Sequence, residues 1–287
     1  MEQAIDHLEN KDKNNNDLSI PQRFNQQHKW EEYTIDACTE DQKQILAYIL
    51  KYVKTWYELD KTQESIKTFK PLKMNFCGQA GSGKSTLINT LVTAIRKIFQ
   101  KNNSVYVCGP TGSAAFNAGG ETCHHLFSIP TKMKETVLAE KAQKTLNTKL
   151  EDTIALIIDE RSKLSSFVLG TMENYCRQAA FKGTQSHLSW GGLPIVILVG
   201  DDYQLPAIDE GAFYCHGKQT NCTRTSEEHF MVQNGMEWFM KMGENVMTLK
   251  QSKRVLQEQK HLQHILQCLR GESDQILTQQ DAEYLCS

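Results

Sequence analysis

The sequence predicts an α/β domain of the doubly wound type, in which a parallel sheet is covered by helices on both faces. Short, continuous apolar runs recur along the chain and alternate with segments of helical periodicity, which is typical of strands buried on both sides. A glycine-rich loop directly follows the first apolar run and directly precedes a helical segment. The expected strands span residues 72–77, 104–108, 154–158, 195–199 and 245–249.

Two helices are expected around the first strand. One begins near Thr39, because apolar residues recur at three- and four-residue spacing from Ile45 to Val53. Residues 58–70 are expected to form a polar connection to the first strand. The second helix follows the glycine-rich loop, and its apolar positions are Leu87, Ile88, Leu91 and Ile95.

The length of 287 residues allows one large domain with a substantial core. Residues 1–36 are polar and lack sustained periodicity, so we expect a disordered arm. Residues 37–255 hold the α/β pattern, and residues 256–287 are expected to form a helical extension. The net charge of -2 neither supports nor excludes a nucleic-acid partner, because only the surface that meets phosphate must be basic.

Two features of composition bear on the compartment. No stretch of about eighteen consecutive apolar residues is present, and the polar, acidic N-terminus resembles neither a signal peptide nor a transit peptide. The nine cysteines are odd in number, and Cys77 and Cys108 lie in apolar runs, which indicates reduced thiols. We expect an intracellular protein without a membrane partner, in the nucleus if the source is eukaryotic and otherwise in the cytoplasm.

The glycine-rich loop, GQAGSGKS at 78–85, matches the phosphate-binding pattern G-x-x-x-x-G-K-[ST]. Glycines let backbone N–H groups turn inward around phosphates, and the following helix presents its positive N-terminal end. Lys84 is expected to contact the β- and γ-phosphates of ATP, and Ser85 to bind Mg²⁺. The residues expected to contact the nucleotide are Gly78, Gln79, Ala80, Gly81, Ser82, Gly83, Lys84, Ser85 and Thr86.

An Asp-Glu pair ends the third expected strand. We expect Asp159 to hold Mg²⁺ and Glu160 to orient or deprotonate the attacking water. Such a pair alone is usually a solvated strand end. Together with the phosphate-binding loop upstream it becomes informative, because the two strands can lie side by side in a parallel sheet.

Many classes of protein contain both a phosphate-binding loop and an Asp-Glu pair. Further segments of the sequence distinguish between these classes. Gly-Asp-x-x-Gln-Leu-Pro within 191–206 is the most specific of them. In matching order, over about residues 38 to 280, they resemble the motifs of the Pif/RecD group of superfamily 1 DNA helicases. These segments are CTEDQ (38–42), PTGSAA (110–115), GGETCHHLF (119–127), DERSKL (159–164), GGLPIVILVGDDYQLP (191–206) and LKQSKR (249–254).

The resemblance implies a RecA-like P-loop NTPase domain, the first motor domain of a 5′-to-3′ DNA helicase that uses ATP and Mg²⁺ on single-stranded DNA. It implies that Gln42 contacts adenine and that Gln204 links the γ-phosphate to the DNA track. It also implies that Arg254 contacts the γ-phosphate from the far side of the cleft. In this family the segments that contain Thr111, Gly112 and His124 line the path of single-stranded DNA.

Each of these residues has a simpler alternative role. Thr39 and Gln42 also fit a capping box at a helix start. Gln204 can close a turn, and Arg254 lies in a basic stretch that suits solvent or DNA. For His124, a neutral polar role in the core competes with a DNA contact.

The chain departs from the family pattern at several positions. Arg161 and Lys163 replace the small or aliphatic residue and the Met that usually follow the Asp-Glu pair. Asp202 replaces an aromatic residue, Ala207 a second proline, and Val255 a common Gln. An arginine beside the catalytic acid can pair with it and lower its basicity, or can face DNA phosphate.

Too few residues follow Arg254 for a second α/β domain, so we expect a fragment or a gene product that lacks the second motor domain. Such a chain should bind Mg-ATP, hydrolyse it slowly and not unwind duplex DNA alone. One alternative is a nucleotide-gated DNA-binding or scaffold module. Another is a P-loop kinase, for which no acceptor-site motif is present.

Overall fold

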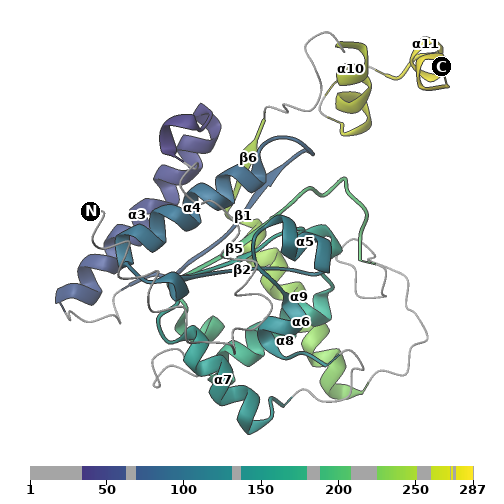
Figure 1. Ribbon diagram of the computed structural model, residues 1–287. Coiled ribbons are helices and arrows are strands. Elements are labelled where there is room, and N and C mark those ends of the chain that lie inside the picture. The colour runs from purple at the N-terminus through teal and green to yellow at the C-terminus, as the bar shows by residue number, and fades with distance from the viewer. Residues whose placement is uncertain are drawn as a thin grey trace, which may run out of the picture.

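The computed structural model describes residues 34–62, 69–130, 137–179, 188–207, 225–250, 260–271, 273 and 276–286. In these residues six strands form one sheet in the order β3-β2-β4-β5-β1-β6, and all five strand pairs are parallel (Figure 1). The parallel sheet and all five predicted strands are confirmed. The strands are β1 (Leu72–Gly78), β2 (Val105–Gly109), β3 (Glu121–Thr122), β4 (Ala155–Ile158), β5 (Ile195–Gly200) and β6 (Val246–Leu249).

Strand β3 was not predicted. It has two residues, and it extends the sheet by pairing Glu121 with Cys108 and Thr122 with Gly109. A run of two polar residues carries neither alternation nor an apolar signal, so no sequence pattern could show it.

The expectation that the strands before the phosphate loop and before the Asp-Glu pair lie side by side is wrong. Strand β5 lies between them, with Ile195 aligned with Leu72 of β1 and with Ala155 of β4. All six residues of β5 are buried, as a central strand covered on both faces requires. The loop that follows β5 is therefore placed between the phosphate loop and the acidic pair.

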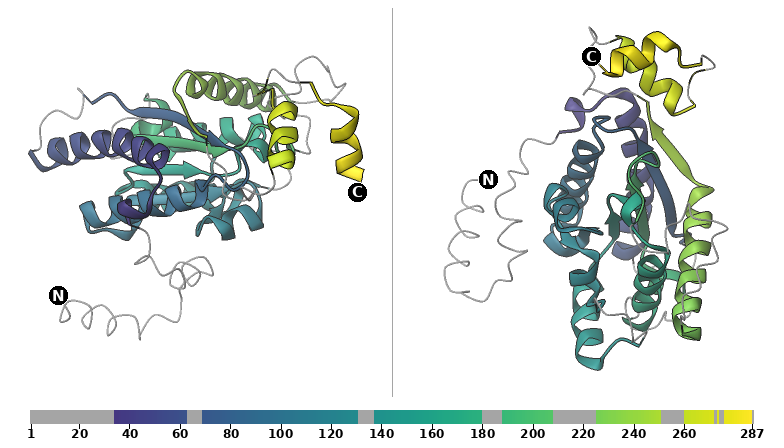
Figure 2. Two further views of the ribbon diagram at one scale, coloured as in Figure 1. Left: turned by 90° about the horizontal axis from the view of Figure 1, so that it is seen from above. Right: turned by 90° about the vertical axis from the view of Figure 1, so that its right-hand side faces the viewer.

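Helices cover both faces of the sheet, with α4 (Lys84–Phe99) on one side and α9 (Ser226–Gly243) on the other (Figure 2). Helix α3 continues to Thr62, so the polar connection predicted from residue 58 is wrong over its first five residues. Charged residues such as Glu58 and Lys61 are good helix formers, and polarity alone does not end a helix. The longer helices are α3 (Glu40–Thr62), α4 (Lys84–Phe99), α7 (Glu140–Leu150), α8 (Ser166–Ala179) and α9 (Ser226–Gly243). Short α-helices are α5 (Gly112–Asn117) and α6 (Cys123–Phe127), and single 3₁₀ turns are η3 (Ile35–Ala37), η5 (Asn102–Ser104), η6 (Arg161–Lys163) and η8 (Ser189–Gly192).

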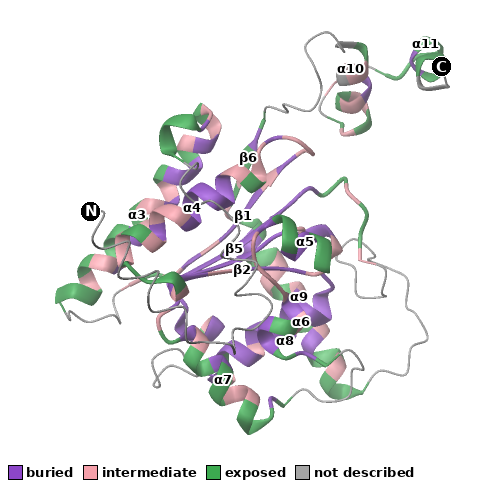
Figure 3. Ribbon diagram, viewed as in Figure 1, coloured by how far each residue is buried: buried purple, intermediate pink, exposed green. Residues whose placement is uncertain are grey.

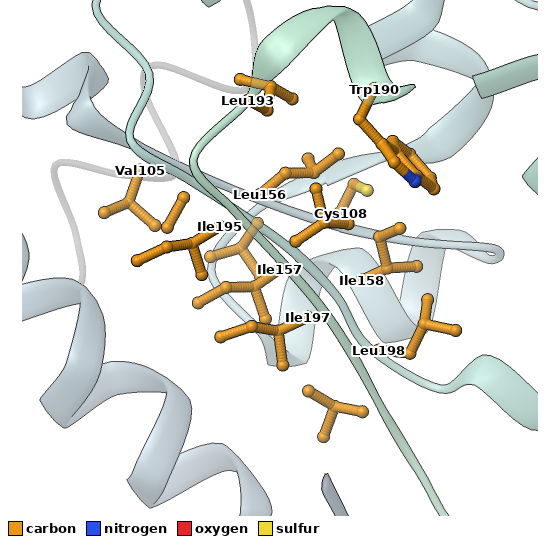
Figure 4. Packing of buried hydrophobic residues seen from close by; sticks show 14 of the residues in the cluster. Val105, Cys108, Leu156, Ile157, Ile158, Trp190, Leu193, Ile195, Ile197 and Leu198 are labelled. Atoms are coloured by element: carbon orange, nitrogen blue, oxygen red, sulfur yellow. The ribbon is translucent and has the colours of Figure 1, made fainter. Parts of the chain in front are cut away.

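Buried residues are concentrated in the central strands β4 and β5 and in the helices α4 and α8 that cover them (Figure 3). Side chains of β4 and β5 pack beside Leu193 and Trp190 (Figure 4). Helices α8 and α9 cross closely at two glycines: a Cβ on Gly170 would lie 1.9 Å from the carbonyl oxygen of Met231. A Cβ on Gly235 would lie 1.8 Å from another carbonyl oxygen, so neither position admits a side chain at this separation.

Two further helices, α10 (Lys260–Leu269) and α11 (Gln279–Cys286), lie beyond the end of β6 and outside the layers of the sheet (Figure 1). His261 Nε2 of α10 lies 2.9 Å from Asp281 Oδ1 of α11. Helices thus occur in the expected extension, while the boundary at residue 255 and the arm up to residue 33 lie outside the described residues. No helix in the described ranges is long and apolar enough to cross a membrane.

Candidate nucleotide-binding and hydrolysis site

Three loops meet at the carboxyl ends of β1, β5 and β4, which are neighbours in the sheet. The phosphate loop follows Gly78, the loop beginning at Asp201 follows β5, and the acidic pair follows Ile158. Parallel strands place all three at the same edge of the sheet, where ligands of open α/β sheets bind.

The phosphate loop has the conformation that its sequence predicts. Gly81 and Gly83 have φ values of +82° and +84°, a region that favours glycine. Helix α4 begins at Lys84, and no acidic residue occupies its first turn. The Lys84 ammonium donates to the carbonyl oxygens of Gly78 at 2.6 Å and Gln79 at 3.1 Å. It is therefore folded over its own loop, with α4 directing backbone N–H groups to the same side.

The side chains available to a metal differ in burial. Ser85, in the first turn of α4, is exposed, whereas Asp159 is 6% exposed. Asp159 Oδ1 accepts the backbone N–H of Glu160 at 2.8 Å, and the Asp159 N–H donates to the carbonyl of Cys108. A hydroxyl and a carboxylate are the oxygen ligands that Mg²⁺ prefers, so these residues fit a magnesium ion held with the nucleotide.

Burial raises the pKa of Asp159 to about 6. The hydrogen bond from Glu160 N–H lowers this pKa, the negative charge of Glu160 raises it, and the positive charge of Lys84 lowers it. The net upward shift means that the surrounding positive charge does not compensate for the burial of the Asp159 carboxylate. A divalent cation would supply that charge.

The side chain of Glu160 pairs with a lysine of the turn that follows. Glu160 has a φ of +53° and caps the 3₁₀ turn η6. Its Oε2 lies 2.7 Å from Lys163 Nζ, three residues further on. Lys163, one of the departures from the family pattern, is therefore the cation that pairs with the expected catalytic acid.

Arg161, the other departure in this segment, does not pair with Glu160. Its guanidinium is 3% exposed and contacts both carboxylate oxygens of Asp202 at 2.5 Å. Arg161 Nη2 also lies 3.5 Å from Cys77 Sγ of β1. Burial alone would lower the pKa of Arg161, but the hydrogen bonds to Asp202 outweigh it, and the net shift is upward. Arg161 and Asp202, both departures from the family pattern, thus pair with one another.

The loop after β5 is held from a second side by Arg270, which directly follows α10. Arg270 Nη1 and Nη2 lie 3.1 and 2.8 Å from the carboxylate oxygens of buried Asp201. Burial raises the pKa of Asp201, the hydrogen bond from Arg270 lowers it, and the net shift is downward. The Tyr203 hydroxyl donates to the carbonyl of Arg270. Sequence reasoning missed this contact; its only signal was an acid in an apolar setting, which requires a partner.

The position of Gln204 bears on its alternative role. The turn is closed by backbone N–H groups, from Gln204 to the Asp201 carbonyl at 3.1 Å and from Tyr203 to Asp201 Oδ1 at 3.2 Å. The side chain of Gln204 is not the group that closes it. Arg254, expected to contact the γ-phosphate, lies outside the described residues.

Gln42 makes the capping box that was the alternative to adenine contact. Its Oε1 accepts Thr39 N–H at 2.8 Å, and its own N–H donates to Thr39 Oγ1 at 3.4 Å. Its Nε2 donates to the carbonyl of Gly83 at 3.0 Å, which fastens α3 to the phosphate loop. Adenine contact would require this buried amide to change rotamer, and that role stays a prediction.

A groove of about 350 Å³ lies beside the site and brings two expected DNA-binding residues together. Thr111 and His124 line it, and so do Lys163 and the loop after β5. Gly112 begins α5, is exposed, and is not among the lining residues. The lining residues are Pro110, Thr111, His124, Lys163, Leu164, Ser165, Val168, Leu205, Pro206 and Ala207.

The parallel sheet, the glycine loop before α4 and the buried acid at the end of β4 define a RecA-like P-loop domain. The family model described as PIF1-like helicase matches residues 39–274 of this chain. The chain belongs to the PIF1-like helicase family.

Curated relatives agree with this assignment. The ATP-dependent DNA helicase PIF1 of Saccharomyces cerevisiae is 32% identical over 157 residues, which cover 53% of this chain and 18% of that protein. The ATP-dependent DNA helicase RRM3 of the same species is 31% identical over 136 residues, which cover 46% and 18%. The matches thus span less than a fifth of each relative.

Solved structures support the fold. The crystal structure of Pif1 helicase from Candida albicans has a TM-score of 0.57 at 21% identity, over 87% of this chain and 47% of that one. Bacteroides Pif1 bound to single-stranded DNA has a TM-score of 0.53 at 23% identity, over 86% and 48%. This chain therefore corresponds to about half of those helicases.

Proposed function

We propose that this chain is the first motor domain of a 5′-to-3′ DNA helicase, which hydrolyses Mg-ATP in response to single-stranded DNA. The observation that carries the proposal is the meeting of three loops at one sheet edge. There, Lys84 is folded over the phosphate loop, the buried Asp159 directly follows β4, and the loop after β5 lines the groove that contains Thr111 and His124.

The chain's own groups would divide the work of hydrolysis. Backbone N–H groups of residues 78–86 bind phosphate oxygens, and Lys84 exchanges the carbonyls of Gly78 and Gln79 for the β- and γ-phosphates. Ser85 and Asp159 would hold the magnesium ion. When bound, Mg-ATP supplies a γ-phosphoryl group whose charge the metal partly neutralises. Glu160 accepts the proton of the attacking water, and Gln204 orients the γ-phosphate.

The groove supplies the proposed DNA contact. Thr111 lies in the loop after β2, His124 lies in α6, which directly follows β3, and the loop after β5 also lines the groove. That loop also carries Gln204, so one segment would touch both DNA and nucleotide. The Thr111 hydroxyl accepts a hydrogen bond from the N–H of Ala114 at 3.2 Å and thereby caps the start of α5. A contact between Thr111 and DNA would therefore be made from this helix start.

A second motor domain is part of this proposal. The solved Pif1 chains are about twice as long as the portion that this chain covers. In P-loop enzymes an arginine supplied across the cleft raises the rate by about 10³–10⁵. We therefore expect the chain alone to hydrolyse ATP slowly and not to unwind duplex DNA.

The proposal is tested by measuring ATP hydrolysis with and without single-stranded DNA. We expect DNA to raise kcat severalfold. We expect Lys84→Ala to lower hydrolysis by about 10²-fold or more in both conditions, because it removes a cation that stabilises charge in the transition state.

Other outcomes would favour other functions. Tight binding of ATP and DNA without turnover would favour a nucleotide-gated DNA-binding module. Turnover indifferent to DNA would favour a kinase-type P-loop enzyme. DNA affinity that does not fall with rising salt would remove the proposed phosphate contacts.

A further inference from the structure

Lys163 belongs to two sites at once. Its ammonium lies 2.7 Å from Glu160 Oε2, the proposed acceptor of the water proton. The same residue lines the groove that holds Thr111 and His124. Lys163 therefore contacts the proposed base and also lines the groove proposed to bind DNA.

The local backbone explains how one side chain reaches both sites. Glu160 has a left-handed φ of +53°, and the N–H of Lys163 donates to its carbonyl at 3.0 Å. This tight turn places the two side chains on the same side. The neighbouring cation, Arg161, points inward to Asp202 and cannot take the place of Lys163.

The Lys163–Glu160 pair is suited to exchange. The two side chains are 32% and 26% exposed, so water screens their attraction, and such pairs contribute little stability. A lysine ammonium is a point charge on a flexible stem that binds phosphate as readily as carboxylate. A backbone phosphate in the groove would therefore compete effectively for it.

We propose that Lys163 couples DNA binding to ATP hydrolysis by changing partner. Without DNA, its ammonium holds the Glu160 carboxylate away from the attacking water. With DNA, a backbone phosphate binds the ammonium and frees the carboxylate. Glu160 then accepts one proton from water as the water oxygen bonds to the γ-phosphorus and the bond to the β–γ bridging oxygen breaks, releasing ADP. This inference rests on the proposed function.

The test compares Lys163→Met, which carries the residue usual in the family, with the wild type and two controls. Basal kcat should rise by roughly two- to fivefold, the range that a partly exposed ion pair can hold back. The ratio of the DNA-stimulated to the basal rate should fall by a similar factor. The slope of log affinity for oligo-dT against log salt should decrease by about one, as for one lost phosphate contact.

Two controls distinguish the effect of the positive charge at position 163 from the effect of removing any lysine. Lys163→Arg retains the cation, so it should rescue the salt slope and most of the stimulation ratio. Lys144→Met removes a lysine that is paired within α7, with Nζ 2.7 Å from Glu140 Oε1, and lies outside the groove lining. It should leave both quantities as in the wild type.

Failure of the inference can be distinguished from failure of the proposed function. If DNA does not stimulate the wild type, the proposed motor function is wrong. If DNA stimulates the wild type but Lys163→Met keeps the same basal rate and ratio, or has a lower basal rate, the exchange is wrong. Should Lys163→Met not fold, Lys163→Gln gives the same comparison with a neutral polar side chain, and the same outcomes decide.

Discussion

Replacement of Glu160 by Gln is expected to lower kcat for ATP hydrolysis by roughly 10²–10⁴-fold, the contribution typical of a general base. The amide cannot accept the proton of the attacking water, yet it is nearly the same size. Phosphate binding depends on the loop at Gly78–Ser85 and on Lys84, which this change does not touch. ATP affinity should therefore stay within a small factor of the wild-type value.

The measurement pairs phosphate release with direct titration of ATP binding. Glu140→Gln is the matched control, because it removes an exposed glutamate that is also paired with a lysine, on α7. It should leave both quantities unchanged. Wild-type turnover in Glu160→Gln would show that another group accepts the proton.

Removal of Asp202 is expected to destabilise the fold by about 2–3 kcal/mol. Asp202→Ala leaves the Arg161 guanidinium, 3% exposed, without its carboxylate, and an unpaired buried charge is costly. We expect a value below the range typical of fully buried pairs, because the Asp202 side chain is itself 40% exposed. Arg161→Met removes the charge and keeps an unbranched side chain, so it should cost less than Asp202→Ala.

Urea unfolding of the two single variants and the double variant measures this coupling. The double variant should be no less stable than Arg161→Met alone. Glu237→Ala serves as a control, because its exposed pair with Lys241, at 3.4 Å, should contribute less than about 1 kcal/mol. Strict additivity of the two changes would contradict the assignment of Asp202 as the partner of Arg161.

Much of the fold follows from local sequence because its signals are local. A buried strand such as β5 is a continuous apolar run, and the phosphate loop is specified by glycines within eight residues of chain. The order of strands is not local. Nothing in the sequences of β1 and β4 indicates that β5 separates them, because the residues of a strand do not specify which strands lie beside it.

The ion pairs of the site were not predictable for a similar reason. Arg161 and Asp202 are 41 residues apart, and Arg270 and Asp201 are 69 apart. The resemblance to the family marks Arg161 and Asp202 as departures from its pattern, but it does not indicate that their side chains meet. Gln42 is the opposite case, because its capping box is a three-residue pattern that the sequence did offer as an alternative.

The central claim is that the loop at Gly78–Ser85 binds the triphosphate of Mg-ATP while Asp159 holds the metal. A crystal structure of the chain with magnesium and a non-hydrolysable ATP analogue tests it most directly. We expect the Lys84 ammonium to leave the carbonyls of Gly78 and Gln79 for the β- and γ-phosphates, with Asp159 facing the ion. An empty loop with Lys84 still on those carbonyls, at nucleotide concentrations that saturate other P-loop enzymes, would contradict the account.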